Sequence, residues 1–522
     1  MKPEHYCSLQ ISRRGFLRRV APTVAVAAAT THTLRDLRLI SSAMAADPIT
    51  DYKALVCIFL NGGNDANNWF IPTNSTEYAS YAAIRTPVLA IPNTDGSPAT
   101  ALALNPLNND GHTYGIHPAC PELQALFNNG RMAPVFNVGT LVYPLTKAQY
   151  VANSPPRPPQ LFSHSDQVSQ WQTSLADQPP STGWGGRVAD VMDYANGAPS
   201  PLSLCITLAG SNTFEVGGVV QQYAVGTGGV TSITTFNNPN STAGSARNAT
   251  LNSILSGSKT RPNLLVSNYA GALSDSLATG SSLSNALNSS QIASYWTTVA
   301  NWSATGTDLQ VVTPNGGRTF GSGLMSQLRM IAKIIEASSR AAGVSNGLGM
   351  KRQIFFCQVG GYDTHTNQTN ASNTTPTPQN VIVGSHADLL AEVSQCIHRF
   401  YNAMGAIGTA QGDPNFINRV TSFTASDFGR TFPCNSLGSD HGWGSHQIVV
   451  GGAVQGRRTY GKWPVLTVNG PDDTSTGRWI PSTAVDQFSA TLAKWFGVGS
   501  SNMAKVFPNL SRFSTPDLGF MG

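Results

Sequence analysis

Two aspartates and two histidines lie within twenty residues of one stretch, 419–456. Asp427 follows the strand-like run 420–425, Asp440 and His441 lie in the next loop, and His446 precedes the apolar run 447–450. Carboxylates and imidazoles beside strand ends are ligands for metal ions or partners in acid–base chemistry. In an open α/β sheet, ligands bind outside the carboxyl ends of the strands. Solvated loop charges are the alternative, which we favour less because charged residues are only 11% of the chain and these are clustered.

Two glycine-rich turns place further carboxylates after apolar runs. The run 54–60 leads into NGGND, which ends at Asp65, and the run 354–359 leads into GGYDTH, which contains Asp363 and His365. The first turn lacks the GxGxxG pattern of dinucleotide sites. Either segment alone is more often a simple turn than a ligand set. Three acidic strand ends in one chain together indicate a shared site for metal ions.

Ser163 and His164 precede a helical stretch at 167–173. A serine at the start of a helix has two interpretations. It is commonly an N-cap, for which Ser165 and Asp166 are stronger candidates here. It is also well placed as a nucleophile, because the positive end of the helix dipole attracts anionic substrates. The sequence leaves these two roles of Ser163 open.

The elements that must position these residues alternate along the chain. Short apolar runs at 54–60, 133–138, 202–208, 354–359, 420–425 and 447–450 are typical of strands buried on both faces. Helical patterns lie between them, at 121–127, 323–342 and 386–407, and Gly343 is placed to cap the second. The sequence therefore predicts an α/β fold, with a doubly wound, mainly parallel sheet between helical layers.

One region departs from this rhythm. Residues 226–304 are dense in Ser, Thr, Asn, Gly and Ala, with apolar spacing for one or two helices after residue 264. We interpret them as an insertion in a single domain that spans 46–522. Its composition leaves open whether it covers the catalytic face or decorates the surface.

The first 45 residues have the features of a twin-arginine signal peptide. A twin-arginine signature, SRRGFLR at 12–18, precedes an Ala-rich run, and Ala43-Met44-Ala45 offers a cleavage site. Export by the twin-arginine translocase to a periplasmic or extracellular location is expected. Six cysteines remain in the mature chain, so disulfides are permitted, but Cys57, Cys205 and Cys357 lie in apolar runs typical of buried thiols.

The net charge of the mature chain argues against a nucleic-acid partner. Of 32 Lys+Arg and 27 Asp+Glu, seven and two lie in the first 45 residues, which leaves 25 of each sign. No basic stripe interleaved with aromatic residues is present. No apolar run in the mature chain approaches the ~20 residues of a membrane span.

Together these motifs carry a family resemblance. The leader, GGND at 62–65, Ser163-His164, GGYDTH at 360–365, SDFGRT at 426–431 and DHGWG at 440–444 resemble the bacterial family catalogued as domain of unknown function 1501. That family is similar to the alkaline phosphatase and sulfatase superfamily. The resemblance implies a doubly wound sheet with two divalent ions, Zn, Mn, Mg or Ca, at its strand ends.

The resemblance also implies roles for single residues. Asp65 would bind one ion with Asp427, and Asp363 and His365 would bind the other, completed by His441 or His446. Ser163, His164 and Arg430 are the candidate catalytic residues, of which Ser163 is chosen by its position alone. Arg430 would either clamp the ester oxygens bidentately or pair with a local carboxylate. The chain departs from the superfamily at Phe428, where a histidine is usual, so Asp440 and His441 must supply the missing imidazole. It also lacks the Cys-x-Pro-x-Arg sequence of formylglycine sulfatases.

These expectations define two functions. The first is an exported metal-dependent hydrolase of phosphate or sulfate esters, acting on a small molecule or a polysaccharide. The second is a non-catalytic polysaccharide-binding or surface-assembly module in which the metal serves structure only.

Overall fold

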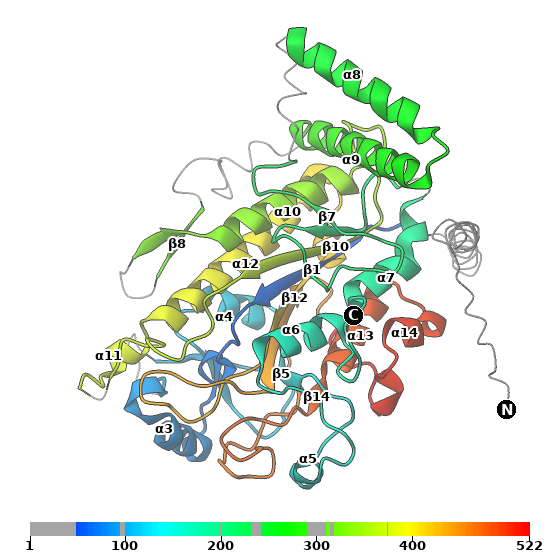
Figure 1. The fold of residues 1–522 in the computed structure, drawn as a ribbon. Coiled ribbons are helices and arrows are strands. Elements are labelled where there is room, and N and C mark those ends of the chain that lie inside the picture. Colours follow the sequence, from blue (N-terminus) through cyan, green and yellow to red (C-terminus); the bar gives the residue numbers. More distant parts are fainter. Residues whose placement is uncertain are drawn as a thin grey trace, which may run out of the picture.

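The computed structural model describes residues 49–93, 100–197, 200–230, 242–290, 309–313, 318–372 and 374–522. The predicted signal peptide at 1–45 lies outside the described residues. The described chain is organised around one large sheet, with helices on both of its faces (Figure 1).

The large sheet has nine strands in the order β13-β5-β12-β11-β1-β10-β6-β7, with β14 paired to β5. Neighbouring strands are parallel except at β12, which runs antiparallel to both β11 and β5. The predicted α/β fold with a mostly parallel sheet is confirmed. The strands are β1 (Lys53–Leu60), β5 (Met132–Gly139), β6 (Cys205–Thr207), β7 (Tyr223–Ala224), β10 (Arg352–Val359), β11 (Val420–Ser426), β12 (Ser445–Gly451), β13 (Tyr460–Gly461) and β14 (Thr483–Ala484).

Strand β1 shows why the sequence of these strands is apolar without alternation. Successive side chains of a strand point to opposite faces of the sheet. Val56 and Ile58 belong to one buried cluster and Cys57 and Phe59 to another, so each face of β1 lies in a hydrophobic core. A strand covered on both faces favours apolar residues at every position, which explains the run ALVCIFL.

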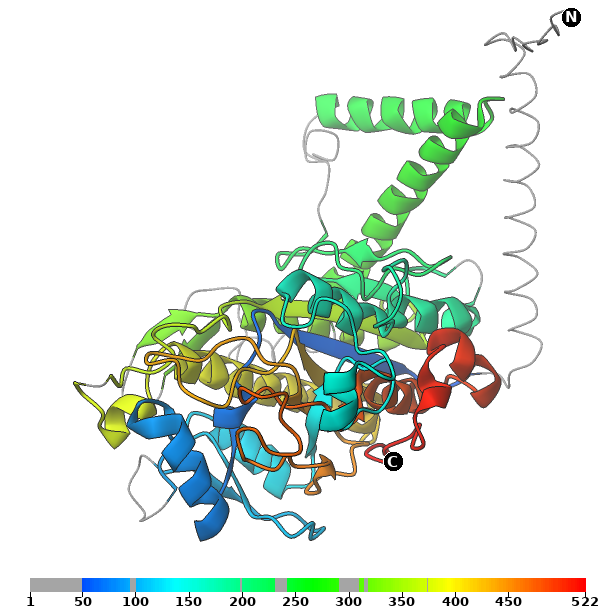
Figure 2. The same cartoon turned by 60° about the horizontal axis from the view of Figure 1, so that its bottom comes forward.

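Helices build the two layers over the sheet. Helices α4, α10 and α12 contribute buried residues to the first core, and α7, α13 and α14 contribute to the second. Both views show these two groups on opposite sides of β1 (Figures 1 and 2). Their bounds are α4 (Pro121–Asn128), α10 (Gly323–Ser339), α12 (Ser385–Gln411), α7 (Trp184–Met192), α13 (Val485–Phe496) and α14 (Ser500–Val506).

Helix α10 ends earlier than the predicted range 323–342. Arg340 already has an extended backbone, with φ −61° and ψ 142°. Its guanidinium donates to the carbonyl oxygens of Ala286 and Ser345, and these tertiary contacts end the helix before its apolar pattern does. The predicted cap Gly343 lies in the following turn, with φ +79°.

The predicted insertion contains a helical hairpin, α8 (Thr242–Lys259) and α9 (Leu264–Asn288). Figure 2 shows both helices projecting from the body of the molecule. The C-terminal end of α9 is tied to Arg340, which precedes the start of β10. The hairpin is therefore anchored near the amino ends of the parallel strands, and it does not cover the edge at which their carboxyl ends lie.

The described residues contain no membrane-spanning helix and no disulfide. Among the described helices, none is long and apolar enough to cross a bilayer. All six described cysteines are free, and all but Cys434 are buried. The other helices and strands are α2 (Ala66–Trp69), β2 (Phe70–Pro72), α3 (Ser75–Leu89), β3 (Leu102–Leu104), β4 (Tyr114–Ile116), α5 (Lys147–Ala152), α6 (His164–Thr173), β8 (Gln310–Val312), β9 (Thr319–Gly321) and α11 (Pro378–Val381).

Candidate metal centre

Three adjacent parallel strands end together at the edge of the sheet where the candidate site lies. β1 pairs with β10 on one side and β11 on the other, and Leu60 is opposite both Val359 and Ser426. The residues that follow β10 and β11 are therefore neighbours in space. Asp363 comes shortly after β10 and Asp427 directly after β11.

Four side chains converge beyond these strand ends. Nε2 of His441 lies 3.1 Å from Nε2 of His164 and 2.9 Å from Nε2 of His365. Oδ1 of Asp363 lies 3.1 Å from Nε2 of His365 and 3.5 Å from Nε2 of both His164 and His441. His164, Asp363 and His441 thus form one group of donor atoms, and His365 adjoins this group through its contacts with Asp363 and His441.

These distances fit a bound metal ion. A tetrahedral ion held at 2.0–2.1 Å places its ligand atoms about 3.3 Å apart, close to the 3.1–3.5 Å between the donor atoms of His164, Asp363 and His441. His164, Asp363 and His441 offer ligand atoms within 4.8 Å of one another, a group that could hold a metal. The side chains of Asp363 and His365 are 49% and 40% exposed, so the centre is open to solvent.

The other ring nitrogen of each histidine is held by an acceptor. Nδ1 of His164 lies 2.7 Å from Asp427, Nδ1 of His365 lies 3.0 Å from Asp440, and Nδ1 of His441 lies 2.8 Å from the carbonyl oxygen of Phe162. A carbonyl oxygen can only accept, so Nδ1 of His441 carries the proton and the Nε2 lone pair faces the centre. Acceptors behind each ring are the usual support of metal-binding histidines.

This arrangement changes the predicted roles of two carboxylates. Asp427 and Asp440 were expected to contact an ion, but they stand behind His164 and His365 instead. The second oxygen of Asp427 accepts the backbone N–H of Gly62 at 3.0 Å, which fixes the carboxylate against the end of β1. Both residues therefore orient imidazoles, and His164, expected as a catalytic partner of Ser163, joins the donors.

The pKa values of the donors follow from these contacts. The hydrogen bond with Asp427 raises the pKa of His164 above its usual value, with support from the charges of Asp427 and Asp363. Burial lowers the pKa of His441, and the neighbouring His164 and Arg430 add to this effect. Burial opposes ionisation of Asp363, but the hydrogen bond and charge of Arg430 outweigh it and lower the pKa. An unprotonated His441 and an ionised Asp363 are the forms that bind a cation.

Arg430 is occupied by acceptors of the protein. Its Nη1 donates to Oδ1 of Asp363 at 2.9 Å and to the carbonyl oxygen of Gly62 at 3.0 Å. Nε donates to the carbonyl oxygen of Ser439 at 2.8 Å, and the side chain is fully buried. Such a guanidinium is not free to clamp ester oxygens, so the structure places Arg430 as the residue that positions Asp363.

The structure does not bring Asp65 into the group of donors. Its carboxylate forms a fully buried ion pair with Arg85 of α3 and accepts a hydrogen bond from Gln368. It also accepts the backbone N–H of Asn67 at 3.2 Å and so caps α2. A guanidinium thus takes the position beside Asp65 that the resemblance assigned to an ion.

His446 also lies apart from the donors. Its Nδ1 accepts the backbone N–H of Asn137 at 3.1 Å, and its ring stacks on Trp463 with centroids 4.8 Å apart. Phe70 and Phe136 contact the same ring. Burial lowers the pKa of His446 to about 3, which keeps it neutral as a packing residue.

Ser163 takes the N-cap position of α6, but its hydroxyl does not cap the helix. The hydroxyl donates to Oδ2 of Asp166 at 2.6 Å and lies 3.2 Å from the hydroxyl of Ser165. Ser165 and Asp166 lie inside the first turn of α6, so neither is the N-cap that the sequence suggested. Ser163 therefore has a carboxylate partner and is bonded directly to the donor residue His164.

Phe428 occupies the position where the superfamily usually has a histidine. Its ring lies 4.7 Å from the ring of His164 and 4.9 Å from that of His441, measured between centroids. A Cβ atom at Gly63, whose φ is +82°, would fall 2.4 Å from the Phe428 ring. The glycine of the first turn thus makes room for an aromatic wall that holds two imidazoles in place.

Sequence patterns did not reveal Arg478. Its Nε donates to the carbonyl oxygen of His441 at 2.7 Å, and its guanidinium lies 4.2 Å above the ring of Phe162. Among the described residues its two terminal nitrogens have no hydrogen-bond partner. Asp473 accepts the backbone N–H of Arg478 at 2.8 Å and so fixes the loop. Arg478 is half-buried and is joined directly to the donor residue His441 by the Nε hydrogen bond, so its terminal N–H groups are available to a ligand beside the centre.

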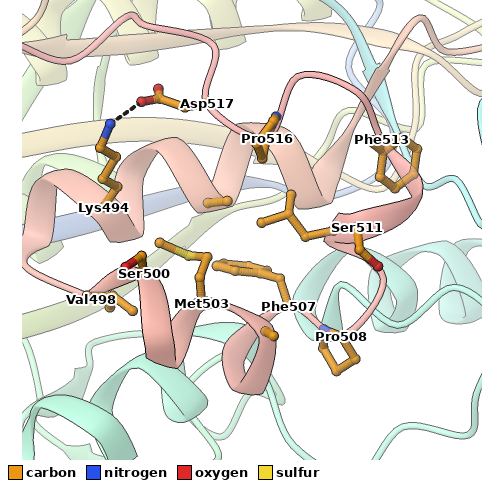
Figure 3. A pocket seen from close by; sticks show the side chains of 14 residues that line it. Lys494, Val498, Ser500, Met503, Phe507, Pro508, Ser511, Phe513, Pro516 and Asp517 are labelled. Atoms are coloured by element: carbon orange, nitrogen blue, oxygen red, sulfur yellow. Dashed lines mark hydrogen bonds and ion pairs between the residues drawn. The ribbon is translucent and has the colours of Figure 1, made fainter.

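Two pockets differ in their relation to this centre. A cavity of about 690 Å³ between α13 and α14 is lined mainly by apolar side chains, and its only charged pair is Lys494 with Asp517 (Figure 3). It contains no donor of the metal centre. A second pocket, of about 560 Å³, is lined by residues 150–162 and ends at Phe162, whose carbonyl oxygen holds His441.

Comparison with known proteins identifies part of the chain. Residues 345–505 match the family described as "Protein of unknown function (DUF1501)", which confirms the predicted resemblance over this stretch. The stretch includes Asp363, His365 and His441 but not His164. A search of the curated proteins found no match.

Proposed function

We propose, from the family match over residues 345–505 and the donor group of His164, Asp363 and His441, that the protein is a metal-dependent hydrolase of phosphate or sulfate esters. The observation that carries the proposal is the open group of His164, Asp363, His365 and His441 at the carboxyl edge of the sheet. We further propose that the protein is exported by the twin-arginine translocase and acts outside the cytoplasm.

The donor set indicates which ion would bind. Three imidazoles and one carboxylate suit zinc and similar transition metals, whereas Mg²⁺ and Ca²⁺ prefer oxygen ligands. Because Asp65 is paired with Arg85, the residues support one ion in place of the two that the resemblance implies. Bound there, the ion would supply Lewis-acid chemistry, polarising an ester oxygen and neutralising negative charge.

The chain's own residues would then perform the remaining tasks. Asp427, Asp440 and Arg430 hold the donors in one orientation, which lowers the cost of reorganisation during the reaction. Asp166 accepts the hydrogen bond of the Ser163 hydroxyl and would take its proton as general base if the serine attacks the ester. Arg478 offers free N–H groups to the anionic ester beside His441.

Metal analysis combined with an ester screen tests the proposal. We expect about one transition-metal ion per chain, lost in Asp363→Asn and His441→Ala but kept in His398→Ala, a control at an exposed histidine of α12. Phosphate and sulfate aryl esters would be hydrolysed by the metal-loaded protein and not after chelation. Stoichiometric metal in both ligand variants would remove this site, and metal without turnover of any ester would remove the hydrolase.

One observation favours the second function, a binding module with a structural ion. His365 lies 2.9 Å from Nε2 of His441, and a site that took it as a fourth ligand would be complete, whereas catalytic zinc sites usually keep one position for water or substrate. Cobalt substitution distinguishes the two. A four-coordinate spectrum that does not respond to phosphate or sulfate would favour the binding module, and a spectrum that changes with these anions would favour the hydrolase.

A further inference from the structure

The pocket lined by residues between 150 and 162 contains no donor of the metal centre, although Phe162 in its lining accepts a hydrogen bond from His441. We define the lateral groove by Tyr150, Asn153, Arg157, Gln160, Leu161 and Phe162. We propose that the lateral groove binds a negatively charged oligosaccharide, so that the substrate is a sugar polymer carrying several ester groups. This inference rests on the proposed function for the reaction and on the groove itself for the ligand.

Covalent and packing contacts join the groove to the donors on two sides. Phe162 lines the groove, lies two residues before His164, and accepts the hydrogen bond of His441. Tyr150 packs against Trp443, two residues after His441, with ring centroids 5.9 Å apart. A ligand that fills the groove therefore lies beside the metal centre.

The charge of the groove selects an anion. Arg157 is the one charged residue among those that line it, and no acidic residue lines it. The Arg157 guanidinium lies 4.8 Å above the ring of Tyr150, and its Nη1 donates to the Tyr150 carbonyl oxygen at 3.2 Å. Stacking of this kind holds the guanidinium in a fixed plane and leaves other N–H groups to bind a sulfate or phosphate bidentately.

A second stacked arginine borders the same wall. Arg478 lies over Phe162 as Arg157 lies over Tyr150. Lys147 of α5 donates to the carbonyl oxygens of Asn469 and Gly470, which ties the groove to the loop that carries Arg478. Two aromatic residues of the groove lining thus each carry a stacked arginine, and Arg478 is also hydrogen-bonded to the donor residue His441. Two such guanidinium groups suit a ligand with more than one anionic group.

The rest of the lining suits a sugar. The amide side chains of Asn153 and Gln160 can pair with hydroxyl groups, and the rings of Tyr150 and Phe162 offer flat apolar faces to sugar C–H groups. A volume of about 560 Å³ exceeds what a single ester group needs and falls within the ~300–1,000 Å³ of pockets for larger ligands.

Binding to metal-free protein tests this inference separately from hydrolysis. The probes are dextran oligosaccharides that are sulfated, phosphorylated or unsubstituted, with affinity measured by calorimetry at fixed salt. We expect both charged probes to bind more tightly than the neutral one. Arg157→Ala should weaken them about tenfold, the loss of one charge-assisted contact. Arg458→Ala, at an exposed arginine of another pocket, is the matched control.

Each outcome decides the matter. Equal affinity for charged and neutral probes, or equal losses in the two arginine variants, would overturn the groove as an anion site. A preference for one charged probe identifies the ester type. Because the ion is absent, a protein that failed to hydrolyse esters could still bind these probes, and so the two proposals fail independently.

Discussion

Nδ1 of His164 lies 2.7 Å from Oδ2 of Asp427, and this contact turns Nε2 of His164 toward His441 and Asp363. The first residue of α6 is thereby joined to the end of β11, 263 positions away in the sequence. The sequence suggested the Asp427 carboxylate as a metal ligand, but in the structure this carboxylate orients the imidazole of His164.

Asp427→Asn tests this role. The amide has one oxygen for two donors, His164 and the N–H of Gly62, so the imidazole loses its fixed orientation. Metal affinity should fall about 10- to 100-fold, the usual effect of losing such a partner. Competition with a chelator measures the affinity. Asp388→Asn, which breaks a surface pair with Arg318, should change nothing, and complete loss of the ion would instead make Asp427 a ligand.

Asp65→Asn should destabilise the fold without removing the ion. The substitution leaves the buried guanidinium of Arg85 without its charged partner, which costs about 3–5 kcal/mol of unfolding free energy. Denaturant unfolding and metal content, measured on one preparation, separate the two effects. Loss of metal at unchanged stability would return Asp65 to the set of ligands.

Ser163→Ala separates a nucleophile from a structural serine. Because the hydroxyl makes no capping bond, we expect a stability loss below the ~1 kcal/mol of a true N-cap. Ester turnover should fall by a factor of ~1,000 or more if Ser163 attacks the ester. Ser165→Ala, one residue into the same helix, provides the matched control. Full turnover in Ser163→Ala would assign the attack to another group.

Arg478→Ala should raise KM for small aryl esters about tenfold, since the anion loses a charge-assisted contact. Arg157→Ala should leave these small substrates unaffected, because Arg157 lies along the lateral groove. Steady-state kinetics with a small ester and a sulfated oligosaccharide compare the two variants. An equal rise in KM for the small ester in both variants would contradict the separate roles of Arg478 at the ester and Arg157 in the lateral groove.

Glu215 makes stability depend on pH. Burial raises the pKa of this carboxyl from 4.5 to about 8, although Asn212 donates a hydrogen bond to it. The folded protein therefore binds a proton that the unfolded chain releases, and the associated stability is complete below pH 4.5 and lost as pH rises to about 8. The slope should be roughly 1.4 kcal/mol per pH unit in that window. Unfolding at several pH values checks this slope, from which Glu215→Gln should remove the Glu215 contribution and leave that of Asp486, whose pKa burial raises to about 7.

The sheet could be predicted because its cause is local. A strand covered on both faces is buried along its length, and the apolar runs of β1 and of the middle of β10 show this directly in their sequences. The end of α10 could not be predicted in the same way. The apolar pattern continues to 342, whereas Arg340 leaves the helix to bind carbonyl groups far away in the sequence.

The candidate site could likewise be predicted from the sequence only in part. Asp363, His365 and His441 follow strand ends, and their position alone indicated that they face a common edge. Sequence spacing does not distinguish a metal ligand from the residue that orients the ligand. Asp427, expected as a ligand, instead holds the ring of His164 by a hydrogen bond. Asp65 was assigned to an ion because nothing in the spacing shows that Arg85, on α3, reaches it.

The central place of β1 has a consequence for any shortened form of the protein. β1 is hydrogen-bonded to both β10 and β11, and it lies outside the stretch 345–505 that defines the family match. A fragment limited to that stretch would carry β10 and β11 without the strand between them, each exposing a row of unpaired backbone N–H and C=O groups. Such edges recruit strands from other chains. The matched stretch should therefore aggregate when produced alone, and the smallest autonomous folding unit must begin before Lys53.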